Sequence, residues 1–234
     1  MKTVIMTFHV ASQPGVSSMT DLKVYYEDNH LLVVEKPENM PTCEDESKDY
    51  DLLSLCKDYL KEKYNKPGNV FLGLVHRLDR PVGGIMVFAK TSKAASRLSK
   101  AINEKKFRKE YLAVVEDNGL KDRDILLDNL LKDEKTNTVK VDRRGKQAEL
   151  AYETVKRKDN LALVHIYLKT GRSHQIRVQF SSRNHALWGD QRYNSNAKKG
   201  QQIALHSYRL SFPHPVTKEI LTFTSEIDRY PFNI

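Results

Sequence analysis

The chain has 234 residues, 39% hydrophobic and 29% charged, a composition typical of a globular protein that is long enough to bury a core. Lys and Arg number 39 against 30 Asp and Glu, and this formal net charge of +9 favours polyanionic partners such as nucleic acid. No apolar run approaches the roughly 20 residues that cross a bilayer, and two cysteines are too few for a disulfide framework, so we expect no membrane contact and a reducing, cytoplasmic location.

The first twenty residues differ in character from the rest of the chain. The stretch MKTVIMTFHVA, residues 1–11, predicts a strand or a loose extension; an export signal is the less favoured alternative, because His9 interrupts it and no clear cleavage site follows. The next ten residues are rich in Ser, Pro and Gly, as in a linker. We therefore predict an N-terminal extension over residues 1–20 and one folded catalytic domain over 21–234.

Residues 22–107 contain β-rich runs and two segments with helical spacing. Pro37 ends the first pair of β-rich runs, and Thr91 or Ser92 can cap the second helix. In chain order, the predicted elements are a hairpin or bent strand over 23–37, a helix over 49–64, two buried strands joined by a turn over 73–90, and a helix over 91–106.

The second half alternates strands with charged segments. The second strand around KRKDN is apolar on both faces, which favours a central place in a sheet. The predicted elements are a strand over 109–116, loops over 118–144 with short β-like pieces, two strands over 148–170, a helix from 170–173 through Gln179, and two strands over 204–227. Because strands and helices do not alternate strictly, we predict an α+β fold with a largely antiparallel or mixed sheet.

A single carboxylate, Asp79, lies among His76, Arg77 and Arg80 in the turn HRLDRPVGG between two apolar runs. An aspartate in a turn usually bonds nearby backbone amides, and this is the structural alternative. If the strand continued through the turn, alternation would place Arg77 on the same side as Asp79. A neighbouring cation lowers the pKa of a carboxylate and keeps it ionised, which suits a nucleophile or an electrostatic stabiliser.

Three other stretches carry candidate residues. Lys36 ends an apolar strand, and Tyr111 lies within the strand KEYLAV. The stretch TGRSHQIRVQF is dense in hydrogen-bond donors, and a glycine and arginines before a helix predict a phosphate site, with a solvated helix face as the alternative. Its candidate residues are Arg172, His174, Gln175 and Arg177.

The sequence offers no motif for a cofactor. No histidine lies at metal-ligand spacing from a suitable carboxylate, Gly83 and Gly84 do not continue into a dinucleotide fingerprint, and no G-x-S-x-G elbow occurs. We therefore expect neither a metal nor an organic cofactor.

Five motifs occur in one order: HRLDRPVGGIMVFAKT, KEYLAVV, KTGRSHQIRVQF, GDQRY and LHSYRLSFPHP. With them the chain resembles the RluA family of RNA pseudouridine synthases from about Asp21 to Phe223. The resemblance implies a cofactor-free isomerase that converts uridine in RNA to pseudouridine by detaching, rotating and rejoining the base. It also implies a mixed, mainly antiparallel sheet with flanking helices and loops, and a catalytic cleft across its middle.

The resemblance assigns roles to four residues. Asp79 is expected to be the essential aspartate, Tyr111 to pack near the base, Arg177 to pair with the aspartate, and Arg77 to fill the space left by the flipped nucleotide. A fixed carboxylate fits the positive charge that develops on a sugar when its glycosidic bond breaks, whereas the residues leave open whether Asp79 attacks the sugar, attacks the ring or helps to remove a proton. The predicted RNA-binding residues are Arg77, His76, Arg80, Lys36, Arg172, His174 and Gln175.

We expect a monomer that acts on ribosomal or transfer RNA. The extension is too short for a separate RNA-binding domain, so recognition falls to the catalytic domain, and the sequence names neither the RNA nor the uridine. Two alternatives stay open. One is an aspartate-dependent nucleosidase or glycosidase, although no second carboxylate stands in the motifs; the other is a catalytically silent RNA-binding module.

Overall fold

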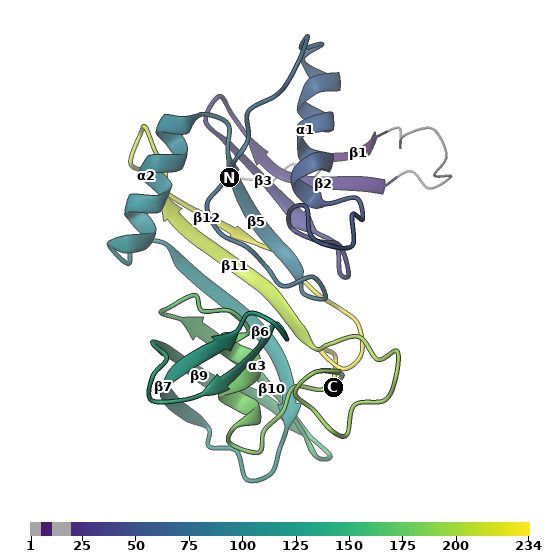
Figure 1. Ribbon diagram of the computed structural model, residues 1–234, viewed down its shortest axis with the longest axis vertical. Helices are drawn as coiled ribbons and strands as arrows, with labels where there is room; N and C mark the ends of the chain where they lie inside the picture. The colour runs from purple at the N-terminus through teal and green to yellow at the C-terminus, as the bar shows by residue number, and fades with distance from the viewer. Residues whose placement is uncertain (1–5, 11–19) are drawn as a thin grey trace. The chain divides into compact units, whose positions relative to one another are not determined.

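The computed structural model describes residues 6–10 and 20–234, which divide into two compact units (Figure 1). Unit 1 takes Met1–Phe107 and Leu210–Ser225, and unit 2 takes Arg108–Arg209 and Glu226–Ile234. Among the described residues, no helix has both the length and the apolar character needed to span a bilayer.

Unit 1 is an antiparallel sheet with two helices. The strand order is β1, β2, β3, β5, with β4 also on β5, and residues 210–213 of β11 together with β12 belong to the same unit. The elements are β1 Met6–Val10, β2 Thr20–Glu27, β3 Leu31–Lys36, α1 Leu52–Lys63, β4 Gly73–Leu74, β5 Gly83–Ala89, α2 Ser92–Asn103, β11 Leu205–Pro213 and β12 Ile220–Thr224.

The strongest sequence patterns of unit 1 form the expected elements. Every residue of β5 is buried, as its unbroken apolar run predicted. Helix α2 packs against β4 and β5, and its N-cap is Thr91, whose side chain accepts a hydrogen bond from the Ala94 amide at 3.1 Å. Helix α1 begins one residue after Asp51, which caps it in the same way. The hairpin and both helices are therefore confirmed. Of the two buried strands predicted over 73–90, β5 is confirmed, whereas β4 consists of two half-buried residues.

Unit 2 contains further antiparallel strands and one short helix. The strand order is β6, β10, β9, β7, β8, and residues 205–209 of β11 belong to this unit. Strand β10 pairs on both sides, which confirms its predicted central place. The elements are β6 Arg108–Glu116, β7 Arg123–Asp133, β8 Thr138–Val141, β9 Lys146–Lys158, β10 Leu161–Leu168 and α3 Gln175–Ser181.

The prediction of loops over 118–144 is wrong. Strand β7 runs for 11 residues and pairs with β9 on one side and β8 on the other. Its apolar residues lie on both faces: Leu126 and Leu130 are buried, whereas Ile125 and Leu127 are exposed. The period of two that marks a half-buried strand is therefore masked, and pairing on both sides fixes the strand.

Helix α3 begins later than predicted. Its first residue is Gln175, because His174 immediately before it adopts a left-handed, non-helical conformation with φ of 50°. At the N-terminus, residues 6–10 form a strand, as one reading of that stretch expected, whereas the rest of the predicted extension lies outside the described residues. Antiparallel pairing and few helices confirm the α+β fold class.

Candidate active site

Asp79 lies in an irregular connection between β4 and β5 in unit 1. The connection includes a tight turn in which the Val82 amide donates to the Asp79 carbonyl at 2.9 Å. Because residues 75–82 are not a strand, alternation does not set the direction of their side chains. Leu78 is buried, Asp79 is half-buried, and Arg77 is exposed.

Lys36, at the end of β3, holds the connection immediately after Asp79. Its side chain is fully buried, and its Nζ donates to the carbonyl oxygens of Arg80 at 2.9 Å, Pro37 at 2.9 Å and Met40 at 2.5 Å. Three acceptors match the three N–H groups of an ammonium. We therefore assign Lys36 to anchoring this connection, and its predicted contact with RNA stays a prediction.

Two further contacts fix the backbone before Asp79. The Thr42 hydroxyl donates to the Leu78 carbonyl at 2.8 Å and accepts from the Leu78 amide at 3.3 Å. His76 Nε2 accepts from the Val87 amide at 3.1 Å, which ties the connection to β5 and makes Nε2 the unprotonated ring nitrogen in this contact. The peptide groups on both sides of Asp79 are thus held, and a carboxylate so placed is preorganised for chemistry.

Lys36 and Asp79 also interact through their charges. Burial lowers the pKa of Lys36 to about 7, while the negative charges of Asp79 and Glu38 act in the opposite direction and Arg80 adds to the lowering. The carboxylate of Asp79 therefore lies within electrostatic range of a buried ammonium in the same unit.

Two glycines allow β5 to start beside β3. A Cβ on Gly83 would lie 2.9 Å from Glu38 Cγ and 3.3 Å from the Lys36 carbonyl oxygen. Gly84 has φ of 120°, which side-chain-bearing residues rarely adopt. The GG pair thus serves the close approach of β5 to the strand that carries Lys36.

Arg80 is bound within unit 1. Its guanidinium pairs with Asp49 and lies 3.7 Å from the Asp45 carboxylate, and Nη1 donates to the Ser47 hydroxyl at 2.9 Å. These contacts tie the turn to the segment after β3, and a contact of Arg80 with RNA stays a prediction. Arg77 is exposed, as a residue that enters RNA must be, and its predicted insertion is likewise untested.

Arg177 is buried on α3 in unit 2, where it forms a two-pronged ion pair. Its Nε and Nη2 donate to Asp190 at 2.8 and 2.7 Å, both side chains are almost fully buried, and the guanidinium carbon lies 5.2 Å from the centre of the Tyr193 ring. Sequence reasoning missed the role of Asp190, although it noted the motif GDQRY. The predicted pairing of Arg177 with Asp79 joins residues of separate units and stays a prediction.

His174 and Tyr193 hold the start of α3 to the β7–β8 hairpin. The Tyr193 hydroxyl accepts from the Val139 amide at 2.9 Å, so its own proton can be donated to His174 Nδ1 at 2.6 Å. Burial raises the pKa of Tyr193, which keeps that proton in place. This contact joins His174, which has the left-handed conformation, to a residue 19 positions away in the sequence.

Gln175 links the loop before α3 to β9. Its Oε1 accepts from the Thr170 hydroxyl at 2.8 Å and the Arg172 amide at 3.0 Å, and its Nε2 donates to the Glu149 carbonyl at 3.1 Å. Gln175 is buried, so we assign it to shaping this loop, and its predicted contact with RNA stays a prediction. Arg172 is exposed on the same loop.

Tyr111 lies in β6 opposite Ile166 of β10, on a buried face of the unit 2 sheet. Its side chain is 6% exposed. The residues predicted to be catalytic therefore divide between the units, Asp79 in unit 1 and the other two in unit 2, and their mutual approach, like the predicted cleft, stays a prediction.

Known proteins share this fold and this sequence pattern. The human structure titled RNA Pseudouridylate Synthase Domain Containing 4 superposes with a TM-score of 0.74 over 89% of both chains at 19% identity, which concerns the fold alone. A family model described as RNA pseudouridylate synthase matches residues 30–182. The chain belongs to this family, and its resemblance to the RluA family is confirmed.

Two curated relatives carry names that specify an RNA. Ribosomal large subunit pseudouridine synthase C of Buchnera aphidicola subsp. Acyrthosiphon pisum (strain APS) is 32% identical over 82% of this chain and 63% of its own length. Ribosomal large subunit pseudouridine synthase D of Zymomonas mobilis subsp. mobilis (strain ATCC 31821 / ZM4 / CP4) is 32% identical over 88% of this chain and 69% of its own length. The chain thus spans about two thirds of the length of these relatives.

Proposed function

We propose that the protein is an RNA pseudouridine synthase that isomerises uridines in ribosomal RNA, with Asp79 as the essential carboxylate. The observation that carries this proposal is the connection around Asp79, whose backbone is held by Lys36, Thr42 and His76 on both sides of the aspartate. The names of the curated relatives favour ribosomal over transfer RNA. A monomer in the cytoplasm is the proposed form and location.

The proposed reaction conserves every atom of the nucleotide. The N1–C1′ glycosidic bond breaks, the base rotates, and a C5–C1′ bond forms; the hydrogen on C5 leaves and N1 gains one, so the composition is unchanged. Breaking the first bond places positive charge on the sugar, which a fixed carboxylate stabilises electrostatically or captures covalently. Asp79 takes this role, and no oxidant, reductant or hydrolytic water is required.

Access to the uridine requires the nucleotide to leave its stack, at a cost of a few kcal/mol. Arg77 is placed to offset that cost, because it is exposed two residues before Asp79 and a guanidinium can stack on neighbouring bases. Tyr111 and Arg177 complete the proposed catalytic set by packing near the base and pairing with the aspartate.

Substitution of Asp79 tests the proposal. Transcribed ribosomal RNA is incubated with wild type and with Asp79→Ala, and pseudouridine is mapped by chemical labelling and primer extension. Product is expected with wild type and absent with the variant, while RNA affinity changes less than tenfold, because one half-buried carboxylate adds little to phosphate binding. Asp58→Ala, which removes an exposed carboxylate on α1, is the matched control and should retain activity.

Other products would point to other functions. Free uracil in the wild-type reaction would identify a nucleosidase or glycosidase, and tight RNA binding without any product would identify a silent binding module. Full activity in Asp79→Ala would remove Asp79 from its role. Mapping pseudouridines in cellular RNA with and without the gene then identifies the uridine.

A further inference from the structure

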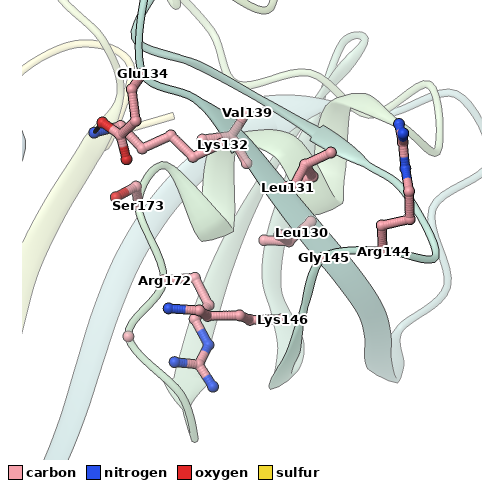
Figure 2. A pocket seen from close by; sticks show the side chains of 11 residues that line it. Leu130, Leu131, Lys132, Glu134, Val139, Arg144, Gly145, Lys146, Arg172 and Ser173 are labelled. Atoms are coloured by element: carbon pink, nitrogen blue, oxygen red, sulfur yellow. Dashed lines mark hydrogen bonds and ion pairs between the residues drawn. The ribbon is translucent and has the colours of Figure 1, made fainter.

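A basic hollow of about 380 Å³ lies in unit 2, beside the hairpin of β7 and β8 (Figure 2). We call it the hairpin hollow. The hairpin of β7 and β8 lines it from the end of β7 to Val139, together with residues 144–145 and the first residue of β9, Lys146, and the loop before α3 at residues 171–173. Its volume falls in the range of sites that hold small molecules and gives room for one nucleotide unit.

The floor of the hollow is apolar and fixed. Leu130 and Val139 are 5% and 6% exposed, and they belong to a core cluster that also contains Ala148 and Val178. Residues on facing strands of a paired hairpin keep their positions, so the hollow is part of the fold rather than a gap between mobile loops.

Four cations line the hollow against one acid, Glu134. Two of the cations are compensated: Lys132 Nζ lies 2.6 Å from Glu134, and Arg144 forms a two-pronged pair with Asp142 at 2.9 and 2.8 Å. The other two are Lys146 and Arg172. Within the part of the chain that the structure describes, neither has an acidic side chain within ion-pair distance, so the hollow keeps a net positive charge.

Arg172 is oriented for an anion by contacts with β9 and with the first residue of α3. Its Nε donates to the Gln147 carbonyl at 2.9 Å, and its amide donates to Gln175 Oε1 at 3.0 Å. The Nε contact leaves the two terminal nitrogens of the guanidinium for another acceptor, and this fork matches the geometry of a phosphate. Ser173 adds a hydroxyl to the same wall.

We propose that the hairpin hollow binds a backbone phosphate of the substrate RNA through Lys146 and Arg172. The inference rests on the proposed function, which supplies the RNA. A polymer fits better than a free nucleotide, because Lys146, Arg172 and Ser173 are all exposed and the site therefore stays open to solvent on its charged side. A phosphate in the hollow would be attracted by both Lys146 and Arg172.

The test compares two double variants that remove the same charge. A fluorescein-labelled RNA stem-loop is titrated with wild type, with Lys146→Ala/Arg172→Ala, and with Lys156→Ala/Lys158→Ala at several salt concentrations. Lys156 and Lys158 are exposed on β9 and do not line the hollow. Loss of the hollow pair is expected to weaken binding roughly tenfold near 0.1 M salt and to reduce the salt slope by about one to two, whereas the β9 pair should change affinity less than about twofold.

Arg144→Ala supplies an internal check. Because Asp142 already compensates the charge of Arg144, Arg144→Ala should weaken RNA binding less than Lys146→Ala does. Equal weakening by the two double variants, or an unchanged salt slope in the hollow variant, would overturn the proposal. Pseudouridine formation by wild type is measured separately, on the ribosomal RNA used for mapping. If pseudouridine forms but the hollow variant binds RNA as wild type does, the proposed hollow is wrong and the proposed function stands. If the hollow variant alone binds RNA more weakly but wild type forms no pseudouridine, the proposed function is wrong and the hollow stands.

Discussion

At the scale of single residues, Lys36 connects the fold to the proposed chemistry. Its ammonium satisfies three carbonyl oxygens, one of them in the residue after Asp79, and a neutral amine would have only two N–H groups for the same three acceptors. Burial nevertheless lowers its pKa to about 7, because no solvent reaches the charge. The anchor of the connection around Asp79 therefore titrates close to neutral pH.

We predict that the ¹³C chemical shift of Lys36 Cε in lysine-labelled protein changes with a midpoint near pH 7, whereas the ordinary pKa of a lysine is 10.5. Lys36→Met identifies the signal by removing it. As the pH rises, Lys36 loses its proton at a lower pH in the folded state than in the unfolded state, so between about pH 7 and 10.5 the unfolded chain binds more protons. The free energy of unfolding of wild type relative to Lys36→Met should therefore rise with pH across that window. A Lys36 signal that titrates above pH 9.5 would contradict this account.

At the scale of elements, one carboxylate joins a helix to the sheet of unit 1. Glu27, at the end of β2, accepts from Lys63 Nζ, the Tyr59 hydroxyl, the Tyr64 hydroxyl and Lys90 Nζ, each at 2.7 Å. Burial raises the pKa of Glu27, but these hydrogen bonds outweigh it and lower the value to about 2. Helix α1 is thus held at its C-terminal end by a group that stays ionised.

Glu27→Gln should lower the free energy of unfolding at pH 7 by about 3 kcal/mol, which is the equivalent of a pKa lowered from 4.5 to about 2. Because the folded-state pKa is the lower one, this contribution is present above about pH 4.5 and is lost as the pH falls toward 2. Urea unfolding at pH 7 and pH 3 measures the difference, which should shrink at pH 3. Glu46→Gln, at an exposed position, is the control, and an equal effect there would refute the role of Glu27.

Sequence alone predicts elements whose pattern is local and misses those fixed from a distance. The apolar run of β5 and the Thr91 cap of α2 are local, and both are confirmed. Strand β7 was missed because apolar residues on both of its faces hide the period of two.

The candidate site divides in the same way. The position of Asp79 between two apolar runs is visible in the sequence. The anchoring of the connection around Asp79 is not, because Lys36 binds the carbonyl of Arg80, which lies 44 residues further along the chain. Likewise, the side-chain contact of His174 needs the Tyr193 hydroxyl, and the ion pair of Arg177 needs Asp190. Contacts of this kind carry no local signal, because they arise only when separate elements pack together.

At the scale of the whole molecule, the chain passes between its two units three times, and unit 1 is completed by a segment from near the C-terminus. Leu210, Phe212 and Phe223 belong to a core cluster of unit 1, and Phe212 stacks on Phe107 with ring centres 5.0 Å apart. The Ser225 hydroxyl donates to Glu35 at 2.8 Å. Residues 1–107 therefore do not contain the whole core of their own unit.

We predict that a fragment of residues 1–107 fails to fold, and that joining residues 210–225 to it through a flexible linker restores folding. Loss of a buried Phe or Leu typically costs about 2–5 kcal/mol, so the absence of three such side chains is comparable to the entire stability of a domain, about 5–15 kcal/mol. Thermal melts followed by circular dichroism and amide NMR spectra compare the two fragments. A matched fusion with Leu210, Phe212 and Phe223 changed to Ser should behave like the short fragment, because it has the linker and the length without the core residues. Cooperative melting of residues 1–107 alone would show that the C-terminal segment is an accessory to unit 1 rather than part of its core.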